Sequence, residues 1–134
     1  MGKLKLQILV VEDNRKNLKL FRDLLEYHGH TVYEANDGLE AIESACLMLP
    51  DIVLLDVQLP KMNGVEVARE LKNRNETKQI PLVAVTAFAM KGDEQRFLEA
   101  GFEGYLPKPI NTRSFVGQVE DFFLRFRSDT HTAV

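Results

Sequence analysis

The chain has 134 residues, a formal net charge of −3 and 45% hydrophobic residues, which suits one domain with a single hydrophobic core. The acidic balance argues against nucleic-acid binding, and no apolar run approaches the roughly 20 residues of a membrane span, so no membrane insertion is expected. The only cysteine, Cys46, cannot form an intramolecular disulfide and favours a cytoplasmic location.

Short apolar runs alternate with amphipathic segments along the whole chain. The runs predict five buried strands, at 6–11, 31–35, 51–55, 82–85 and 104–106. A helix is predicted after each strand, and four residues are placed to cap these helices: Asn14, Asp37, Asn63 and Asn111. In two of them a glutamate three residues later, Glu40 or Glu66, completes a capping box.

The end of the chain is less regular. A weaker helix is predicted over Met90–Ala100, and the last helix is expected to end near Arg127. Residues 1–127 are therefore predicted to form one domain and 128–134 a disordered tail. Alternating strands and helices predict an α/β fold, in which a parallel sheet carries helices on both faces.

Polar residues follow four of the predicted strands. Glu12-Asp13, Asp56, Thr86 and Lys108 come directly after, or just beyond, apolar runs. The carboxyl ends of parallel strands meet at one edge of a sheet, where open α/β sheets bind their ligands. Any one of these residues has an ordinary explanation, such as a turn or a favourable charge before a helix. All of them at one edge predict a functional site.

Three carboxylates at one edge constrain the chemistry of that site. Two unit charges ~4 Å apart repel by about 4 kcal/mol at an effective dielectric constant of roughly 20. Such a cluster takes up protons or binds a cation, and oxygen ligands favour Mg²⁺ before Ca²⁺. One carboxylate is then free to act as a nucleophile toward phosphorus, while Lys108 balances phosphoryl charge and Thr86 donates a hydrogen bond.

The remaining chemistry-bearing residues are interpreted as structural. His28 and His30 flank Gly29 in a turn and His131 lies near the C-terminus, so all three are expected to be solvated. Cys46 lies on an apolar helical face and is expected to fill the core.

Four motifs give the chain a specific resemblance: Val10-Val11-Glu12-Asp13-Asn14, Leu54-Leu55-Asp56-Val57-Gln58-Leu59-Pro60 with Gly64, Val85-Thr86-Ala87, and Lys108-Pro109. Over about residues 6–126 the chain resembles the receiver domain of two-component response regulators. Within that family, the stretch 83–94 is similar to DivK-like single-domain regulators. The resemblance implies a doubly wound, five-stranded parallel sheet of order 2-1-3-4-5 with five helices.

The resemblance also implies roles for individual residues. Asp56 is expected to be the phosphoacceptor, with Lys108 pairing with the phosphate, Thr86 as the switch hydroxyl and Tyr105 as the switch aromatic. Mg²⁺ is expected to bind Glu12, Asp13, Asp56 and the backbone carbonyl of Gln58. Glu12 departs from the aspartate often found first in the acidic pair, and its longer side chain is expected to act through water.

The implied function is a phosphorylation switch rather than an enzyme, limited to self-catalysed phosphoryl transfer and autodephosphorylation. The donor would be a sensor histidine kinase or a histidine phosphotransfer protein. The output would be a downstream kinase or an adaptor protein, bound through the fourth helix, the fifth strand and the last helix. On the last helix, Phe115, Val119, Phe122 and Phe126 form one stripe, while Val116, Phe123 and Leu124 form an apolar edge beside it.

Three alternatives remain open. The chain could be a receiver domain from a larger hybrid sensor kinase. An Asp-nucleophile phosphohydrolase usually has a second acid two residues after the first, where Gln58 stands here. A flavodoxin-like FMN carrier would have a phosphate-binding loop after the first strand, where Glu12-Asp13 would repel phosphate.

Overall fold

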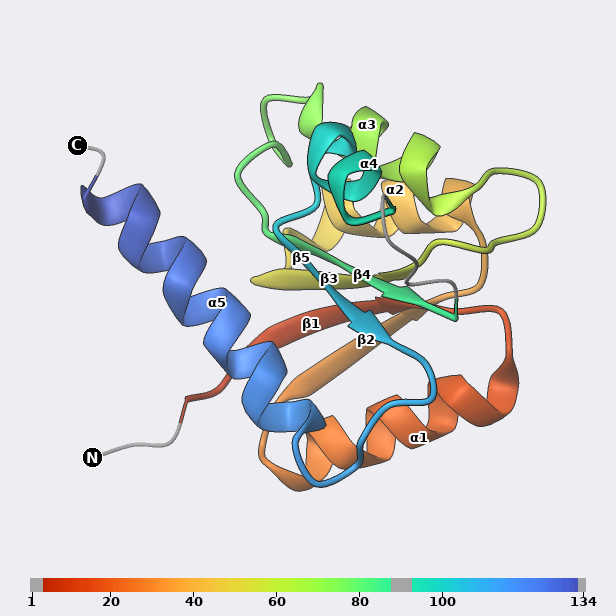
Figure 1. Ribbon diagram of the computed structural model, residues 1–134, viewed down its shortest axis with the longest axis vertical. Coiled ribbons are helices and arrows are strands. Elements are labelled where there is room, and N and C mark those ends of the chain that lie inside the picture. Colours follow the sequence, from red (N-terminus) through yellow and green to blue (C-terminus); the bar gives the residue numbers. More distant parts are fainter. Residues whose placement is uncertain (1–3, 88–92, 133–134) are drawn as a thin grey trace.

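The structure is a computed structural model that describes residues 4–87 and 93–132, with side chains as far as Arg127. Its centre is a five-stranded parallel sheet of order β2-β1-β3-β4-β5, so the predicted fold class and strand order are confirmed (Figure 1). No helix among the described residues has the length and apolar character to cross a lipid bilayer. In chain order the elements are β1 (Gln7–Val11), α1 (Arg15–Tyr27), β2 (Thr31–Ala35), α2 (Gly38–Met48), β3 (Ile52–Asp56), α3 (Gly64–Lys72), β4 (Leu82–Thr86), α4 (Asp93–Ala100), β5 (Gly104–Pro107) and α5 (Phe115–Thr132).

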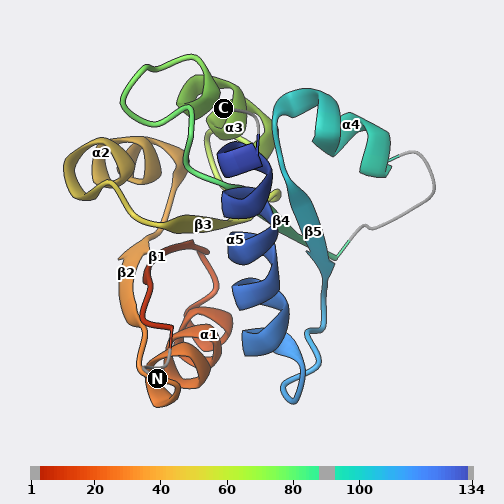
Figure 2. The same cartoon turned by 90° about the vertical axis from the view of Figure 1, so that its left-hand side faces the viewer.

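Helices cover both faces of the sheet. α1 and α5 lie on one face and α2, α3 and α4 on the other (Figures 1 and 2). The side chains of β3 alternate between two hydrophobic clusters, with Ile52 and Leu54 toward α1 and α5, and Val53 and Leu55 toward the other three helices. All of β3 is buried because it lies in the middle of a sheet that is covered twice.

The helix starts follow the predicted capping residues. Side-chain oxygens of Asn14, Asp37 and Asn63 accept backbone N–H groups in the first turns of α1, α2 and α3. Asn111 accepts the N–H of Arg113 in a turn that leads into α5. The described part of α4 begins at Asp93, and its expected start at Met90 lies outside the described residues.

The last helix is longer than the sequence suggested. Residues 128–132, expected to belong to a disordered tail, continue α5 to Thr132. They contain no glycine or proline, so a helix already nucleated on the packed residues Phe115 and Val119 propagates through them. Val116, on the apolar edge beside the predicted stripe, is buried with that core.

His30 was interpreted as a solvated turn residue, and this was wrong. It is buried, and its Nδ1 accepts the backbone N–H of Leu6 at 3.0 Å. Its other ring nitrogen, Nε2, therefore carries the proton and donates to Glu120 of α5 at 2.7 Å. Local sequence could not show this, because both partners are distant along the chain.

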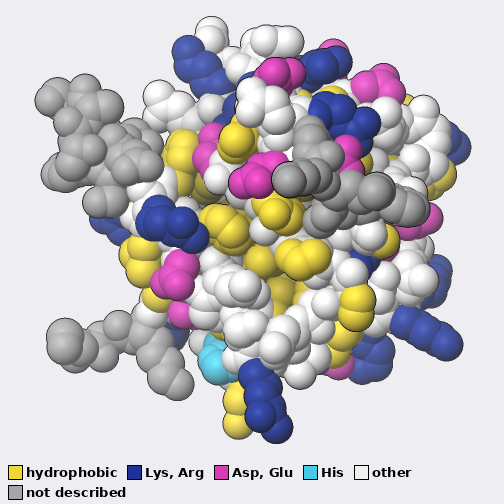
Figure 3. All heavy atoms as spheres, in the orientation of Figure 1, with side chains coloured by type: hydrophobic (Ala, Val, Ile, Leu, Met, Phe, Trp, Pro, Cys, Tyr) yellow, Lys and Arg dark blue, Asp and Glu magenta, His cyan; other side chains and the backbone are white. Residues whose placement is uncertain are grey.

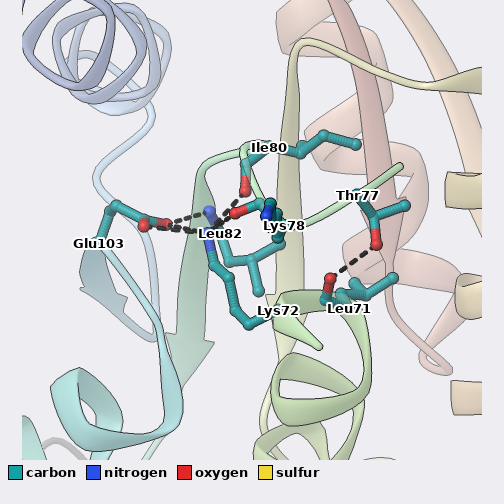
Figure 4. Close-up of polar contacts among 7 residues, drawn as sticks. All are labelled: Leu71, Lys72, Thr77, Lys78, Ile80, Leu82 and Glu103. Atoms are coloured by element: carbon teal, nitrogen blue, oxygen red, sulfur yellow. Dashed lines mark hydrogen bonds and ion pairs between the residues drawn. The ribbon is translucent and has the colours of Figure 1, made fainter. Parts of the chain in front are cut away.

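A second polar network holds the amino-terminal ends of β4 and β5. The ammonium of Lys72, at the end of α3, donates to the carbonyl of Ile80 at 2.9 Å and pairs with Glu103 at 3.0 Å (Figure 4). Glu103 also accepts the backbone N–H of Leu82 at 2.7 Å. This network ties α3 to both strands at the edge opposite their carboxyl ends.

Gly64, at the start of α3, provides a test of how closely this helix approaches β3. A Cβ at Gly64 would lie 2.6 Å from the backbone oxygen of Asp56 and 2.7 Å from the Cα of Val57. Both atoms belong to the backbone and cannot rotate away. Gly64→Ala should therefore lower the free energy of unfolding by about 1–3 kcal/mol, measured by urea denaturation.

Gly117 is the matched control, because a Cβ there meets nothing within 4 Å on the exposed side of α5. Gly117→Ala should raise stability by about 0.5–1 kcal/mol through helix propensity. Equal effects of the two substitutions would contradict the close approach at Gly64.

Candidate functional site

Three carboxylates meet at the carboxyl edge of the sheet. Glu12 follows β1, Asp56 ends β3, and Asp13 stands just before α1. One oxygen from each lies within 4.8 Å of the others. Glu12 and Asp56 are buried, whereas Asp13 is exposed, so the cluster is reached from solvent at Asp13. The predicted convergence of these three residues is therefore present in the structure.

Lys108 compensates part of this negative charge. Its ammonium lies 2.8 Å from Oε1 of Glu12 and 3.0 Å from Oδ2 of Asp56. The backbone N–H of Lys108 donates to the carbonyl of Thr86 at 2.8 Å, which holds the residue beside β4. The ammonium thus bridges two carboxylates, a contact that sequence reasoning missed because it depends on the spatial order of the strands.

The other carboxylate oxygens have backbone partners. Oδ1 of Asp56 accepts the N–H of Gln58 at 2.9 Å, which places Gln58 at this edge of the sheet. Oε2 of Glu12 accepts the N–H of Asn14 at 3.1 Å. Oε1 of Glu12 is buried and faces Lys108, but it has no hydrogen bond of good geometry among the described residues.

Burial shifts the acid–base properties of the cluster. It raises the pKa of the Glu12 carboxyl; the Lys108 ammonium opposes this shift, and the Asp56 charge reinforces it. Burial also acts to lower the pKa of Lys108, but its close contacts with the carboxylates of Glu12 and Asp56 outweigh this effect, so this pKa is raised. Lys108 therefore keeps its charge at neutral pH, and Glu12 holds a proton at higher pH than an ordinary glutamate.

Thr86 and Tyr105 lie on neighbouring strands and toward the same face of the sheet. Tyr105 pairs with Ala84 in the β4–β5 register, two residues before Thr86. Thr86 is buried, while the half-buried ring of Tyr105 lies 6.4 Å from that of Phe97 on α4. The structure therefore places Thr86 at the carboxyl edge and Tyr105 further along β5, toward α4.

A groove runs between α4, β5 and α5. It is a cavity of about 330 Å³, and Figure 3 shows hydrophobic side chains gathered on this face between the two helices. Two leucines on these helices, Leu98 and Leu124, are about half exposed at 53% and 47%. The residues lining the groove include Phe97, Leu98, Tyr105, Phe122 and Arg125.

The donor set suits a hard divalent cation. Carboxylate oxygens are the ligands that Mg²⁺ prefers, and Mg²⁺ keeps several waters, which the exposed side of Asp13 allows. Three carboxylates carry more negative charge than the single Lys108 ammonium offsets, so a divalent cation would complete the charge balance of the cluster. Beside it, Lys108 can hold an oxyanion against Asp56.

Comparisons with known proteins agree with this geometry. Residues 8–120 match the model of the response regulator receiver domain. The chain is 45% identical over 115 residues to the polar-differentiation response regulator DivK of Brucella anthropi, covering 86% of this chain and 94% of that protein.

Two solved structures are similar to the whole fold. One is the receiver domain of the sensor histidine kinase PA1611 from Pseudomonas aeruginosa PAO1, which has a magnesium ion coordinated in its active-site cleft. It is 31% identical with a TM-score of 0.79, covering 92% of this chain and 98% of that one. The other, the chemotaxis response regulator CheY4 of Vibrio cholerae, is 24% identical with a TM-score of 0.84, covering 89% and 99%, and supports the fold alone.

The family match spans most of the chain, and the acidic cluster and Lys108 meet at the expected edge of the sheet. The chain belongs to the family of response regulator receiver domains, and it is similar to DivK within that family.

Proposed function

We propose that this protein is a single-domain response regulator that accepts a phosphoryl group on Asp56 and then changes its protein contacts. The observation that carries the proposal is the position of Asp56, 3.0 Å from the Lys108 ammonium and grouped with Glu12 and Asp13. The donor would be the phosphohistidine of a sensor histidine kinase or of a histidine phosphotransfer protein.

Each residue has a distinct task in this transfer. A carboxylate oxygen of Asp56 forms a bond to phosphorus while the nitrogen–phosphorus bond of the donor breaks and imidazole leaves. Lys108 stabilises negative charge on the phosphoryl oxygens. Glu12 and Asp13, with Asp56 and the backbone carbonyl of Gln58, would hold Mg²⁺. When bound, this cation neutralises charge on the phosphoryl group and its acceptor.

The switch would run from Thr86 to the groove between α4, β5 and α5. The Thr86 hydroxyl would donate a hydrogen bond to a phosphoryl oxygen and draw the end of β4 toward Asp56. Tyr105 would follow, because it lies on the adjacent strand toward the same face. The groove, whose lining includes the half-exposed Leu98 and the ring of Phe122, is suited to a downstream kinase or an adaptor protein, since exposed apolar patches mark interaction sites.

The proposed role is a signalling switch and not an enzyme with a separate substrate. The match to DivK over 94% of that protein supports a stand-alone regulator. A receiver domain of a hybrid sensor kinase is the alternative, since the PA1611 receiver is 31% identical. We also propose a cytoplasmic location, because a reducing compartment keeps a free thiol such as that of Cys46 reduced.

The first prediction concerns the acceptor. Incubation with acetyl phosphate and Mg²⁺ should add one phosphoryl group, and Asp56→Asn should abolish the addition because an amide is a poor nucleophile. Intact-mass spectrometry measures it, and Asp23→Asn, on the exposed side of α1, is the control that should still be labelled. Full labelling of Asp56→Asn would refute the assignment.

The second prediction concerns cation binding and pH. Mg²⁺ requires Glu12 without its proton, and burial raises the pKa of Glu12 above its ordinary value of 4.5. Mg²⁺ affinity should therefore fall as the pH is lowered from neutral, beginning at a higher pH than an ordinary glutamate would cause and approaching a tenfold loss per pH unit below the pKa of Glu12. Lys108 stays charged over this pH range, so it does not contribute to the pH dependence of Mg²⁺ affinity.

Calorimetric Mg²⁺ titrations across this range measure the effect. Glu12→Gln should bind Mg²⁺ more weakly than wild type at neutral pH, and its Mg²⁺ affinity should depend much less on pH. Asp13→Asn should cost more affinity than Glu12→Gln if Glu12 acts through water. An unchanged pH dependence in Glu12→Gln would show that Glu12 is not the titrating group.

The third prediction concerns the relay. The phosphoryl mimic beryllium trifluoride, added with Mg²⁺, should shift the amide NMR signals of Leu98, Tyr105 and Leu124. In Thr86→Ala the mimic should still bind at Asp56, but those distant shifts should shrink. Thr86→Ser keeps the hydroxyl and should retain them, so wild-type shifts in Thr86→Ala would exclude the hydroxyl as the relay.

A further inference from the structure

A second cavity lies between the loop that follows β3, the helices α3 and α4, and Thr86 at the end of β4. Its volume is about 700 Å³, within the range of small-molecule sites. Val57, Leu59 and Val65 provide apolar lining, and the polar lining includes the Asn63 amide and Thr86. Gln58 and Thr86 also line it, so the cavity adjoins the acidic cluster, whereas Arg69 and Arg96 have no role in the phosphoryl transfer proposed above.

The charged side chains that line this cavity, among the described residues, are all positive. Arg69 of α3 and Arg96 of α4 both line it, and no acidic side chain among the described residues does. Within the described part of the chain, Arg69 has no carboxylate at ion-pair distance. Arg96 is 57% exposed and lies 3.8 Å from Asp93, at the limit of an ion pair.

Another cavity of the same protein shows the contrast. Between α1 and β2, the cations Arg15, Lys19 and Arg22 share the lining with three acids, Asp23, Glu26 and Glu34. There the charges cancel within the protein. The cavity of Arg69 and Arg96 differs, because no acidic side chain among its described lining residues offsets the two guanidinium charges. This holds although the protein as a whole has a net charge of −3.

The strand register places Thr86 between this cavity and the acidic cluster. Asp56 pairs with Val85, whose side chain packs toward α1 and α5. Thr86 follows Val85 and therefore points to the other face, toward α3 and α4. An anion beside Arg69 and Arg96 would therefore lie on the α3 and α4 side of Thr86 and would be held by cations that do not contact Glu12 or Asp56.

We propose that this cavity binds a small phosphomonoester dianion that carries a compact apolar or aromatic group. Two guanidinium groups match the two negative charges of a phosphate and bind its oxygens with paired hydrogen bonds. Val57, Leu59 and Val65 would receive the apolar group, and Asn63 would donate a further hydrogen bond. The ligand is a small molecule, because the cavity volume suits a molecule of that size.

The experiment titrates the unphosphorylated full chain with phenyl phosphate in Mg²⁺-free buffer and follows amide NMR signals. These conditions leave the proposed phosphorylation of Asp56 out of the measurement, so the two proposals fail separately. Saturable shifts should appear around Arg69, Arg96, Asn63 and Val65. Inorganic phosphate, which lacks the ring, and benzyl alcohol, which lacks the charge, should both bind more weakly.

Arg69→Ala and Arg96→Ala should each weaken phenyl phosphate binding by about fivefold to tenfold, the loss of a charge-assisted hydrogen bond near the surface. Both residues are exposed on helices, where alanine preserves helix propensity. Arg125→Ala removes the same charge from a different cavity and should leave binding unchanged. The proposal is overturned if the shifts centre on Lys108, if phosphate binds as tightly as phenyl phosphate, or if all three variants bind alike.

Discussion

The main physical constraint on this structure is that the sheet holds mutually repelling carboxylates close together. Glu12 and Asp56 end adjacent strands, β1 and β3, and cannot move apart without disturbing a ladder buried on both faces. Lys108 offsets only part of the charge, and burial, reinforced by the charge of Asp56, raises the pKa of Glu12. A cluster of buried carboxylates of this kind would respond strongly to an added cation, as the proposed switch requires.

In the proposed switch, the coupling from this site to the surface would pass through β4 and β5. The backbone bond from Lys108 to Thr86 joins the ends of these strands beside Asp56. Nearer the start of β5, Tyr105 packs near Phe97, at the groove between α4 and α5. At the opposite edge, Lys72 and Glu103 hold the starts of the same strands to α3. Because that edge is anchored, the proposed switch would move the carboxyl ends of β4 and β5 when Asp56 is phosphorylated.

Much of the site was predictable because strand ends in a parallel sheet converge whatever the loops between them do. Asp56, Thr86 and Lys108 could be placed at one edge from apolar runs alone. The pairing of His30 with Leu6 and Glu120 could not be predicted, since these residues meet only when α5 packs beside β1. The extension of α5 to Thr132 was likewise missed, because polar composition suggested fraying where a packed helix continues.

The sequence by itself determined the alternation of strands and helices, the capping residues and the identity of the strand-end side chains. These follow from local periodicity and from the backbone chemistry of caps, which act within a few residues. Only the tertiary structure decided that Lys108 bridges Glu12 and Asp56, and that Arg69 and Arg96 share a cavity beside Thr86. Charges from distant segments interact through space over a few ångströms, and only the packing of helices on the sheet sets those distances.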